Sequence, residues 1–421
     1  MSNQFLSGQS KGVRQSCGVL VCILALLLAA CSDPDKQSEI ARAELAAKAM
    51  KGHDIAVGVV WNQEWNEDDL FFQGARLAQE EINQQGGLDG HLIKIIEAYD
   101  HADEETNLGS TTVARKLAAI PNLLAVIGHS TSASAIPASI TYEHQGILFI
   151  APAATLTELT NHNFQYLFRT IPDNIEQAKK MAEYANSKHY RNLAVIYPSD
   201  KDSEQTAQIF MEKSISKYGI SIVYNKMFSE KTKNFNTILS EILSVGEDIS
   251  KQQVDAIYFS GLLEQAARFI YEARKMGIHT PILGTDDMDS PELWRLSREK
   301  AAGTVVPTVF FNTVDTDDNT KLKHFNETFE KKFGKLPGTW SALAYDAMQL
   351  LAFAINEAES AVPFKIATAL RYMQKPWRGV SGCHRFTRDG NIVGKQIYLK
   401  EMNDHGQFVL LPGQEAVKAC E

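Results

Sequence analysis

Cysteine is scarce in this sequence, with five residues among 421, and no two of them form a CxxC pair. A zinc site built from paired cysteines and a thioredoxin-like redox motif are therefore excluded. The 42 lysines and arginines stand against 51 acidic residues and form no basic block, which argues against a nucleic-acid-binding patch. The chain also has no Walker motif and no GxGxxG after a strand-like run, so the common nucleotide-binding signatures are absent.

The N-terminus carries an apolar run at 19–30, which is too short to span a bilayer as a mature helix. Lys11 and Arg14 precede it, as in the positive region of a signal peptide. The sequence LAAC (28–31) resembles a bacterial lipobox, in which cleavage precedes the cysteine and the thiol receives a diacylglycerol. A plain secretory signal cleaved near residue 30 is the alternative. In both cases residues 1–30 are a targeting segment and not part of the fold.

The targeting segment decides which cysteines remain in the mature protein. Cys17 and Cys22 leave with the signal, and Cys31 is the predicted lipidation site. Only Cys383 and Cys420 then remain, in an exported and oxidising setting. We expect these two to pair and hold the C-terminus, with two free thiols as the alternative.

From Asp54 onward, apolar runs of strand length alternate with amphipathic stretches of helix length. Residues 54–61 are typical of a buried strand, and residues 70–87 of a helix ending at paired glycines. A second series of the same kind begins after Pro172. Repeated alternation of this kind predicts an α/β fold of doubly wound parallel sheets, with helices on both faces.

Two similar series with a late return of the chain predict two lobes. The expected first lobe comprises residues 54–172 and 303–376, and the second comprises residues 173–302 and 377–421. The polar, alanine-rich residues 31–53 are interpreted as a tether between the membrane and the lobes. Ligands of such sheets bind beyond the C-terminal ends of the strands, in a cleft lined by loops.

Two segments of the first lobe follow strand ends, GHSTS (128–132) and FIAPAAT (149–155). Ser132 precedes a helix expected to begin near Ala133, and its hydroxyl together with the free N–H groups of that first turn would suit a carboxylate. The carbonyl of Ala153 could accept from an ammonium, and Thr155 could donate or accept beside it. The two groups together suit the two ends of an α-amino acid. The alternatives are a plain N-cap serine and a solvent-facing turn.

Two further features could complete such a site. In LGTDDMD (283–289), Asp286 follows a strand of the second lobe and could neutralise the ligand's ammonium when the lobes close. An ordinary acidic loop is the alternative. Trp61 and Trp65, at the end of the first strand, are candidates for a wall around the ligand's side chain. Packing in the hydrophobic core is their alternative.

Catalytic and metal-binding interpretations are weaker. GHSTS differs from a hydrolase GHSxG elbow because Ser132 stands where a glycine permits the strained turn, and no later Asp…His pair stands out. The segment DTDDN (315–319) begins like a calcium loop, but Thr320 replaces the required glycine and Asn326 the bidentate glutamate. We therefore expect no enzyme activity, no cofactor and no metal.

Several stretches resemble bacterial periplasmic binding proteins for leucine, isoleucine and valine. They are GHSTSASAIPASITYEHQGILFIAPAATLTELT (128–160), FRT (168–170), GARLAQEEINQQGGLDGHLIKIIEAYD (74–100), AYDAMQLLAFAI (344–355) and GVSGCHRFTRDGN (379–391). The resemblance runs from about residue 54 to the C-terminus. It implies the type I periplasmic-binding-protein fold, two lobes joined by three hinge crossings, and delivery of the ligand to an ABC permease.

By position, the resemblance implies that Ser132 and Thr155 hold the ligand's carboxylate. Ala153 and Thr155 would also serve its ammonium, and Asp286 matches an acidic position of the second lobe that receives the ammonium.

Three departures from the family lie around the ligand's side chain. WNQEWNEDD (61–69) replaces a GPLSG-type loop, Leu262 replaces a tyrosine, and Asp202-Ser203 replaces a tyrosine-glycine pair. The resemblance therefore supports an amino-acid head-group site more firmly than a branched side chain.

The sequence as a whole predicts a monomeric, lipid-anchored solute-binding protein of the bacterial cell envelope, facing the periplasm. Its expected partners are an amino-acid-like ligand, an inner-membrane ABC permease and, through Cys31, the membrane. A non-transport sensor or envelope regulator with the same fold is the alternative. It is favoured by Ser32, because a serine after the lipidated cysteine resembles an outer-membrane sorting signal.

Overall fold

The computed structural model describes residues 54–63, 65–88, 90–100, 108–247, 253–312 and 320–414, together with Glu44 and Cys420. The predicted signal peptide, the lipidation site at Cys31 and all of the predicted tether except Glu44 lie outside these residues. Within the described parts of the chain, no helix has the length and apolar character needed to cross a membrane.

Five parallel strands form the first sheet, in the order β2-β1-β3-β4-β5. Their bounds are β1 (Ile55–Trp61), β2 (Ile93–Tyr99), β3 (Leu123–Ile127), β4 (Leu148–Ala151) and β5 (Leu167–Arg169). Every residue of β1, β3 and β4 is buried. This burial explains why the strands appear in the sequence as continuous apolar runs, which is the pattern of parallel sheets covered on both faces.

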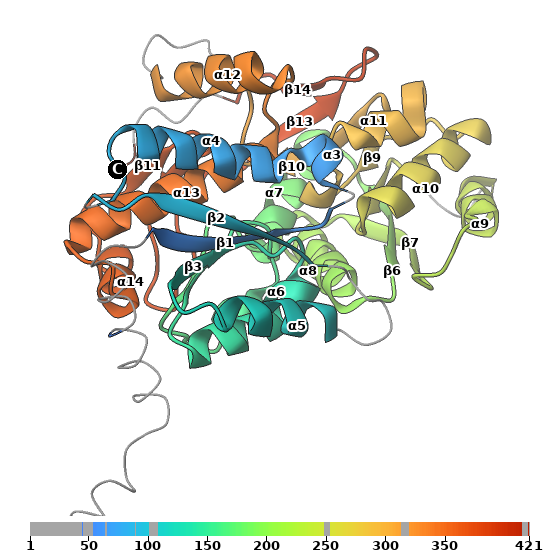
Figure 1. The fold of residues 1–421 in the computed structure, drawn as a ribbon. Helices are drawn as coiled ribbons and strands as arrows, with labels where there is room; N and C mark the ends of the chain where they lie inside the picture. Colours follow the sequence, from blue (N-terminus) through green and yellow to red (C-terminus); the bar gives the residue numbers. More distant parts are fainter. Residues whose placement is uncertain are drawn as a thin grey trace, which may run out of the picture.

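Helices cover both faces of this sheet, with α4 and α13 on one side and α5 and α6 on the other (Figure 1). The elements of this lobe are α3 (Asn66–Asp69), α4 (Phe71–Gln84), α5 (Leu108–Ala118), α6 (Ser132–His144), the 3₁₀ turn η1 (Thr157–Thr160), α12 (Thr320–Phe333), α13 (Thr339–Ala358) and α14 (Pro363–Arg371). Gly74 lets α4 and α13 approach closely, because a Cβ there would lie 2.0 Å from the carbonyl oxygen of Ser341.

Seven strands form the second sheet, in the order β14-β13-β10-β9-β8-β6-β7. Their bounds are β6 (Asn192–Pro198), β7 (Ser221–Phe228), β8 (Ala256–Phe259), β9 (Ile282–Leu283), β10 (Thr304–Thr308), β13 (Tyr398–Met402) and β14 (Phe408–Leu410). The strands from β7 to β10 are parallel, whereas β13 and β14 are antiparallel additions at one edge.

The helices of the second lobe also pack on both faces of their sheet. One core contains residues of α7 and α8, and the other contains residues of α9, α10 and α11. The elements are α7 (Asn174–Ser187), α8 (Lys201–Tyr218), α9 (Asn236–Glu247), α10 (Leu263–Lys275), the 3₁₀ turn η2 (Asp286–Met288), α11 (Glu292–Ser297) and η3 (Arg298–Ala301). The predicted α/β fold of two parallel-sheet lobes is confirmed.

The structure corrects the expected boundaries between the lobes. Strand β10 was assigned to the first lobe, but it pairs with β9 and β13 and so belongs to the second sheet. The segment after residue 376 was assigned to the second lobe, yet the hairpin of β11 (Trp377–Gly379) and β12 (Gly382–His384) lies by α13, and residues up to Ile392 pack in the first lobe's core. Backbone pairing and core contacts decide the lobe, and neither is visible in local sequence.

The chain passes between the lobes three times, near residues 170–173, 309–312 and 393–397. Lys395 joins two of these crossings, because its buried Nζ donates to the carbonyl oxygen of Thr170 at 2.9 Å. The same Nζ donates to the hydroxyl of Ser381 at 2.9 Å. Burial lowers the pKa of Lys395 to about 7, and the charge of Asp346 opposes that decrease.

A buried ion pair lies at the junction of the lobes. The Nζ of Lys400 in β13 lies 3.1 Å from Oδ1 of Asp289, which follows η2. Thr339, at the start of α13 in the other lobe, donates its hydroxyl to Oδ2 of the same carboxylate at 2.6 Å. Asp289 therefore has a cation and a hydroxyl donor, and it connects the two lobes.

A disulfide joins Cys383 in β12 to Cys420, whose Cα atoms are 5.6 Å apart. This distance is in the ordinary range for a disulfide. The structure thus contains the pairing that the cysteine count led us to expect. It attaches the end of the chain to the β11–β12 hairpin of the first lobe.

Candidate functional site

A cleft of about 650 Å³ opens between the lobes, at the C-terminal ends of strands from both sheets. The first lobe contributes the loops after β3 and β4, and the second contributes those after β6, β8 and β9. Five of the six predicted ligand-binding residues line this cleft: Trp65, Ser132, Ala153, Thr155 and Asp286. Residues from four separate segments, the first and last 221 positions apart in the chain, are therefore brought together at one site.

Ser132 is the first residue of α6, and it is not the N-cap, because the side chain of Thr131 caps this helix. The Oγ of Ser132 accepts hydrogen bonds from the backbone N–H groups of Thr155 and Leu156, each at 3.1 Å. The serine hydroxyl thus holds the end of FIAPAAT against the helix. As the first two residues of a helix, Ser132 and Ala133 also have N–H groups without a partner inside that helix, and both line the cleft.

Arg169, in β5, also binds the loop that follows β4. Its side chain is fully buried, and its Nη1 donates to the carbonyl oxygens of Thr155 at 3.2 Å and Leu156 at 2.6 Å. Burial lowers the pKa of Arg169 to about 10, while the carboxylate of Asp173, 3.6 Å away, opposes that decrease. The small residues of the loop leave its backbone accessible, and the arginine fixes where that backbone lies.

Asp286 faces this wall from the second lobe. It lies in η2, its side chain is buried, and its Oδ2 accepts a hydrogen bond from Nε2 of Gln177 at 2.9 Å. Burial raises the pKa of Asp286 to about 7, against the hydrogen bond from Gln177, and the negative charge of Asp202 adds to the increase. A neutral amide is a poor substitute for a cation, so this carboxylate lacks charge compensation.

Two further aspartates of the second lobe surround Asp286. Burial raises the pKa of Asp202 to about 6, and a hydrogen bond from Ser132 opposes that increase. Asp287 is open to the cleft, but its enclosure by both lobes and the charge of Asp286 raise its pKa well above the usual range. Burial and the charges of neighbouring carboxylates thus disfavour the ionised form of all three aspartates, which a cation in the cleft would favour.

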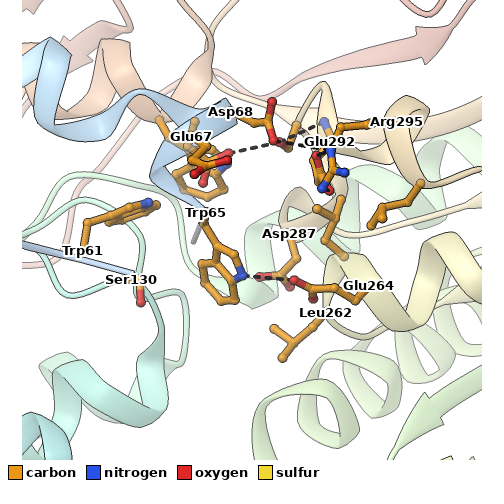
Figure 2. Close-up of a pocket in the computed structure, with 15 residues that line it drawn as sticks. Trp61, Trp65, Glu67, Asp68, Ser130, Leu262, Glu264, Asp287, Glu292 and Arg295 are labelled. Carbon is orange, nitrogen blue, oxygen red and sulfur yellow. Dashed lines mark hydrogen bonds and ion pairs between the residues drawn. The ribbon is translucent and has the colours of Figure 1, made fainter. Parts of the chain in front are cut away.

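Trp65 bridges the lobes at one end of the cleft. Its indole Nε1 donates to Oε1 of Glu264 in α10 at 3.0 Å. Beyond this contact lies a second cavity of about 250 Å³, into which Trp61 and Trp65 project from one lobe and Glu264 and Asp287 from the other (Figure 2). Trp65, Leu262, Glu264 and Asp287 line both cavities, so the two spaces adjoin.

Trp61 has a mixed role. Its ring is stacked on Phe71 with centroids 4.0 Å apart, and it is 1% exposed within the core of the first lobe. It also lines the second cavity, but not the main cleft. The alternative of core packing therefore describes most of its contacts, and Trp65 is the tryptophan that reaches the main cleft.

The hydrolase alternative can be compared with the geometry around GHSTS. An aspartate and a histidine do meet here, since Nδ1 of His129 lies 3.3 Å from Oδ2 of Asp100. The other ring nitrogen of His129 lies 3.0 Å from the hydroxyl of Tyr142, and Ser132 is bonded to the backbone N–H groups of another loop. The histidine therefore does not face Ser132 as a general base would. This arrangement supports the loop and does not activate a nucleophile.

Sequence reasoning missed Arg169, Gln177, Glu264 and Asp287. Only the arginine had a usable signal, because a charged residue inside the short strand FRT has to be neutralised by nearby groups. Gln177 and Glu264 lie on ordinary amphipathic helices, and nothing in their local sequence separates them from surface residues. In the described part of the chain, no group of three or more His, Cys, Asp or Glu side chains could hold a metal ion.

Comparison with known proteins gives consistent results. The family model described as "Periplasmic binding protein" matches residues 69–407. An amino acid binding protein of Pseudomonas aeruginosa is 26% identical over 368 residues, covering 85% of this chain and 93% of that protein. A leucine-specific-binding protein of Salmonella typhimurium is 27% identical over 304 residues, covering 72% and 78% of the two chains.

Solved structures share the fold. An ABC transporter substrate-binding protein from Desulfitobacterium hafniense, in complex with leucine, is 29% identical with a TM-score of 0.73, and the match covers 85% of this chain and all of that one. A leucine binding protein from Thermotoga maritima is 22% identical with a TM-score of 0.75, covering 85% and 97%. The two lobes, the three crossings, the interlobe cleft and the family match agree, and the chain belongs to the periplasmic binding protein family, with the type I fold.

Proposed function

We propose that the protein is an extracytoplasmic solute-binding protein that captures an amino acid, or a related small polar ligand, for an ABC permease. The observation that carries the proposal is the composition of the cleft. One wall presents the first turn of α6 and the small residues of FIAPAAT, and the opposite wall presents Asp286. A donor wall and an acidic wall suit the two ends of a zwitterion.

The head group of the ligand would lie against the first lobe. Its carboxylate would accept from the free N–H groups at the start of α6 and from the hydroxyl of Thr155. Its ammonium would donate to the carbonyl oxygen of Ala153 and, after closure, to Asp286. Ser132 then acts mainly by positioning Thr155, since its Oγ already accepts two backbone N–H groups.

Such a ligand touches both lobes, so its binding favours the closed arrangement over an open one. The permease would recognise the closed form. No bond is made or broken in this process, and the comparisons with binding proteins support a role without catalysis.

The names of the relatives support the same class of function. The relatives from Pseudomonas aeruginosa and Salmonella typhimurium are called amino acid binding and leucine-specific-binding proteins, and a structural neighbour is called an ABC transporter substrate-binding protein. The replacements at Asp202 and Leu262 lie in or beside the cleft. We therefore extend the head-group chemistry, and not the leucine side chain, to this protein.

The test is a thermal-shift screen of the twenty amino acids on protein produced from the full-length gene, followed by calorimetry on any that stabilise it. We expect at least one amino acid to raise the unfolding temperature and to bind with one-to-one stoichiometry. An absence of any stabilising amino acid or simple amine would contradict the proposal.

The membrane attachment is a separate part of the proposal. The LAAC sequence ending at Cys31 supports a lipid anchor on the periplasmic side. Replacing Cys31 by alanine should release the protein from membranes or leave it unprocessed, which fractionation and mass spectrometry would show. Unchanged mass and unchanged fractionation would exclude lipidation.

A sensor or envelope regulator is the second candidate function, and Ser32 is the observation that favours it. Outer-membrane sorting would separate the protein from an inner-membrane permease. Separation of the two membranes by density distinguishes the candidates. Inner-membrane location together with ligand uptake that depends on this protein would support transport.

A further inference from the structure

The two adjoining cavities are lined by far more acidic than basic side chains. Six carboxylates line the main cleft, and no Lys, Arg or His is among the described residues that line it. The second cavity is lined by six carboxylates as well, two of them shared with the cleft. Its single cation is Arg295, which is already bonded to Glu292 and lies 3.8 Å from Asp68.

A zwitterionic amino acid cannot compensate this charge, because its single ammonium is offset by its own carboxylate. Burial raises the pKa of several of these carboxyl groups, Asp69, Asp202, Asp286 and Asp287 among them, so the cleft resists their ionisation when no cation is present. A ligand with net positive charge favours the ionised form and pairs with it. The excess of acidic over basic side chains is therefore a property of the site that the ligand has to match. It predicts at least one cationic group beyond the α-ammonium.

The second cavity has the shape and chemistry to hold that group. It is lined by Trp61, Trp65 and Trp340. The acidic side chains of Glu67, Glu264 and Asp287 lie around the same space (Figure 2). Indole rings and carboxylates together are typical of sites for organic cations, and Trp65 is the ring most accessible here, because Trp61 and Trp340 are largely buried. As no metal-binding cluster occurs among the described residues, an ammonium or guanidinium fits this cavity better than a metal ion.

A buried amide on the floor of the main cleft gives independent support. Asn174 is 2% exposed and lines the cleft, and its Nδ2 donates to the hydroxyl of Thr206 at 3.3 Å. Its Oδ1 has no partner among the described residues. A buried acceptor without a donor is costly, so this oxygen indicates a ligand that brings an N–H donor into the main cleft.

We propose that the ligand is a linear molecule with two cationic groups, one held at Asp286 and the other in the tryptophan-lined cavity beyond Trp65. A basic amino acid and an aliphatic diamine share this chemistry. The inference rests on the proposed function, since it specifies the ligand of the same cleft. It assigns to the second cavity a role in ligand selection.

The experiment is calorimetry on protein produced from the full-length gene with four probes: L-lysine, L-arginine, L-norleucine and 1,5-diaminopentane. Lysine and norleucine differ only by the terminal amine, so their comparison isolates the second cation. We expect lysine or arginine to bind at least tenfold more tightly than norleucine. Tighter binding of diaminopentane alone would support the inference and would show that the ligand has no carboxylate.

Norleucine or leucine binding as tightly as lysine and arginine would overturn the inference while leaving the proposed function intact. No binding by any of these probes or by any amino acid would overturn both.

A variant tests the location of the second group. Glu264→Gln keeps an acceptor for the Trp65 indole but removes a charge from both cavities. The ratio of norleucine to lysine dissociation constants should fall about tenfold. Glu327→Gln, on the exposed face of α12, is the matched control and should leave that ratio unchanged. An unchanged ratio in Glu264→Gln would place the second cation elsewhere and overturn the assignment to this cavity.

Discussion

Asp286 and Asp289 lie three residues apart and have opposite surroundings. Asp289, at the junction of the lobes, receives the ammonium of Lys400 at 3.1 Å and the hydroxyl of Thr339 at 2.6 Å. Asp286, in the cleft, receives only the neutral amide of Gln177. The junction therefore contains its own counter-ion, whereas Asp286 in the cleft has none.

Under the proposed function, this difference separates a charge that serves the fold from one that serves the ligand. A buried carboxylate that serves the fold is paired within the fold, because an unpaired charge would reduce stability. A carboxylate that serves a ligand is left for the ligand to neutralise, and the stability of the unliganded protein is lower as a result. The same argument applies to the acidic residues around Trp65 in the second cavity.

The largest effect should come from the junction. Lys400→Met leaves Asp289 buried beside a neutral side chain, so we expect the free energy of unfolding to fall by about 3–5 kcal/mol. Chemical denaturation measures the loss. Lys226→Met removes a cation from a half-exposed pair with Glu241 and is the control, with an expected loss under about 1 kcal/mol. Equal effects of the two changes would contradict the distinction between the sites.

The second prediction compares the two aspartates directly. Burial raises the pKa of Asp286 from 3.8 to about 7, so this group costs stability progressively as the pH rises from 3.8 to about 7, and the cost is complete above pH 7. Asp286→Asn should therefore stabilise the ligand-free protein at pH 8 by roughly 2 kcal/mol, which is less than the full shift implies because lobe opening readmits water. The gain should shrink as the pH falls toward 5, because the wild-type carboxyl then becomes neutral.

The same substitution at Asp289 should have the opposite sign at pH 8, because it removes the partner of Lys400. Denaturation of both variants at pH 5 and pH 8 gives the four values needed. A destabilising Asp286→Asn would show that Asp286 is compensated within the protein.

With a cationic ligand, Asp286→Ala should weaken binding ten- to a hundredfold, as the loss of one charge-assisted hydrogen bond predicts.

Ser132, on the opposite wall of the cleft, should behave like the junction, since its hydroxyl is already paired within the protein. Ser132→Ala removes the acceptor of the Thr155 and Leu156 N–H groups, and we expect a loss of about 1.5 kcal/mol in unfolding free energy. Ligand affinity should fall less than in Asp286→Ala, because the N–H groups at the start of α6 remain. A large loss of affinity without loss of stability would mean that the hydroxyl contacts the ligand directly.

The smallest effect on binding should come from the disulfide. Cys420→Ser opens the bond to Cys383, which holds the end of the chain to the β11–β12 hairpin and not to the cleft. Ligand affinity should stay within about twofold of the parent, measured by calorimetry. A larger change would show that the C-terminal segment influences closure of the lobes.

Much of the fold could be predicted from the sequence, because burial of a parallel sheet leaves a local trace. The runs around 54–61 and 149–151 became strands β1 and β4 close to their expected limits. The boundaries between the lobes were harder to predict from the sequence. Strand β10 looks like any other apolar run, and only its pairing with β9 and β13 assigns it to the second sheet.

For the candidate site, too, part could be predicted from the sequence and part could not. Ser132, Ala153, Thr155 and Asp286 could be predicted because each follows a strand, and strand ends line clefts in this class of fold. The roles within the wall could not. The bonding of Ser132 to two backbone N–H groups, and the support of the loop by Arg169, join residues 13 to 24 positions apart through space.

The sequence by itself determined the two α/β lobes, the cleft between them and the small residues that expose its backbone, because these depend on local periodicity and on where strands end. Only the tertiary structure decided which charges are compensated. The formal net charge of −9 gives the excess of acid but not its location. Electrostatic energy depends on distance and burial in space, so Asp286 and Asp289 differ in environment although the chain places them within one turn.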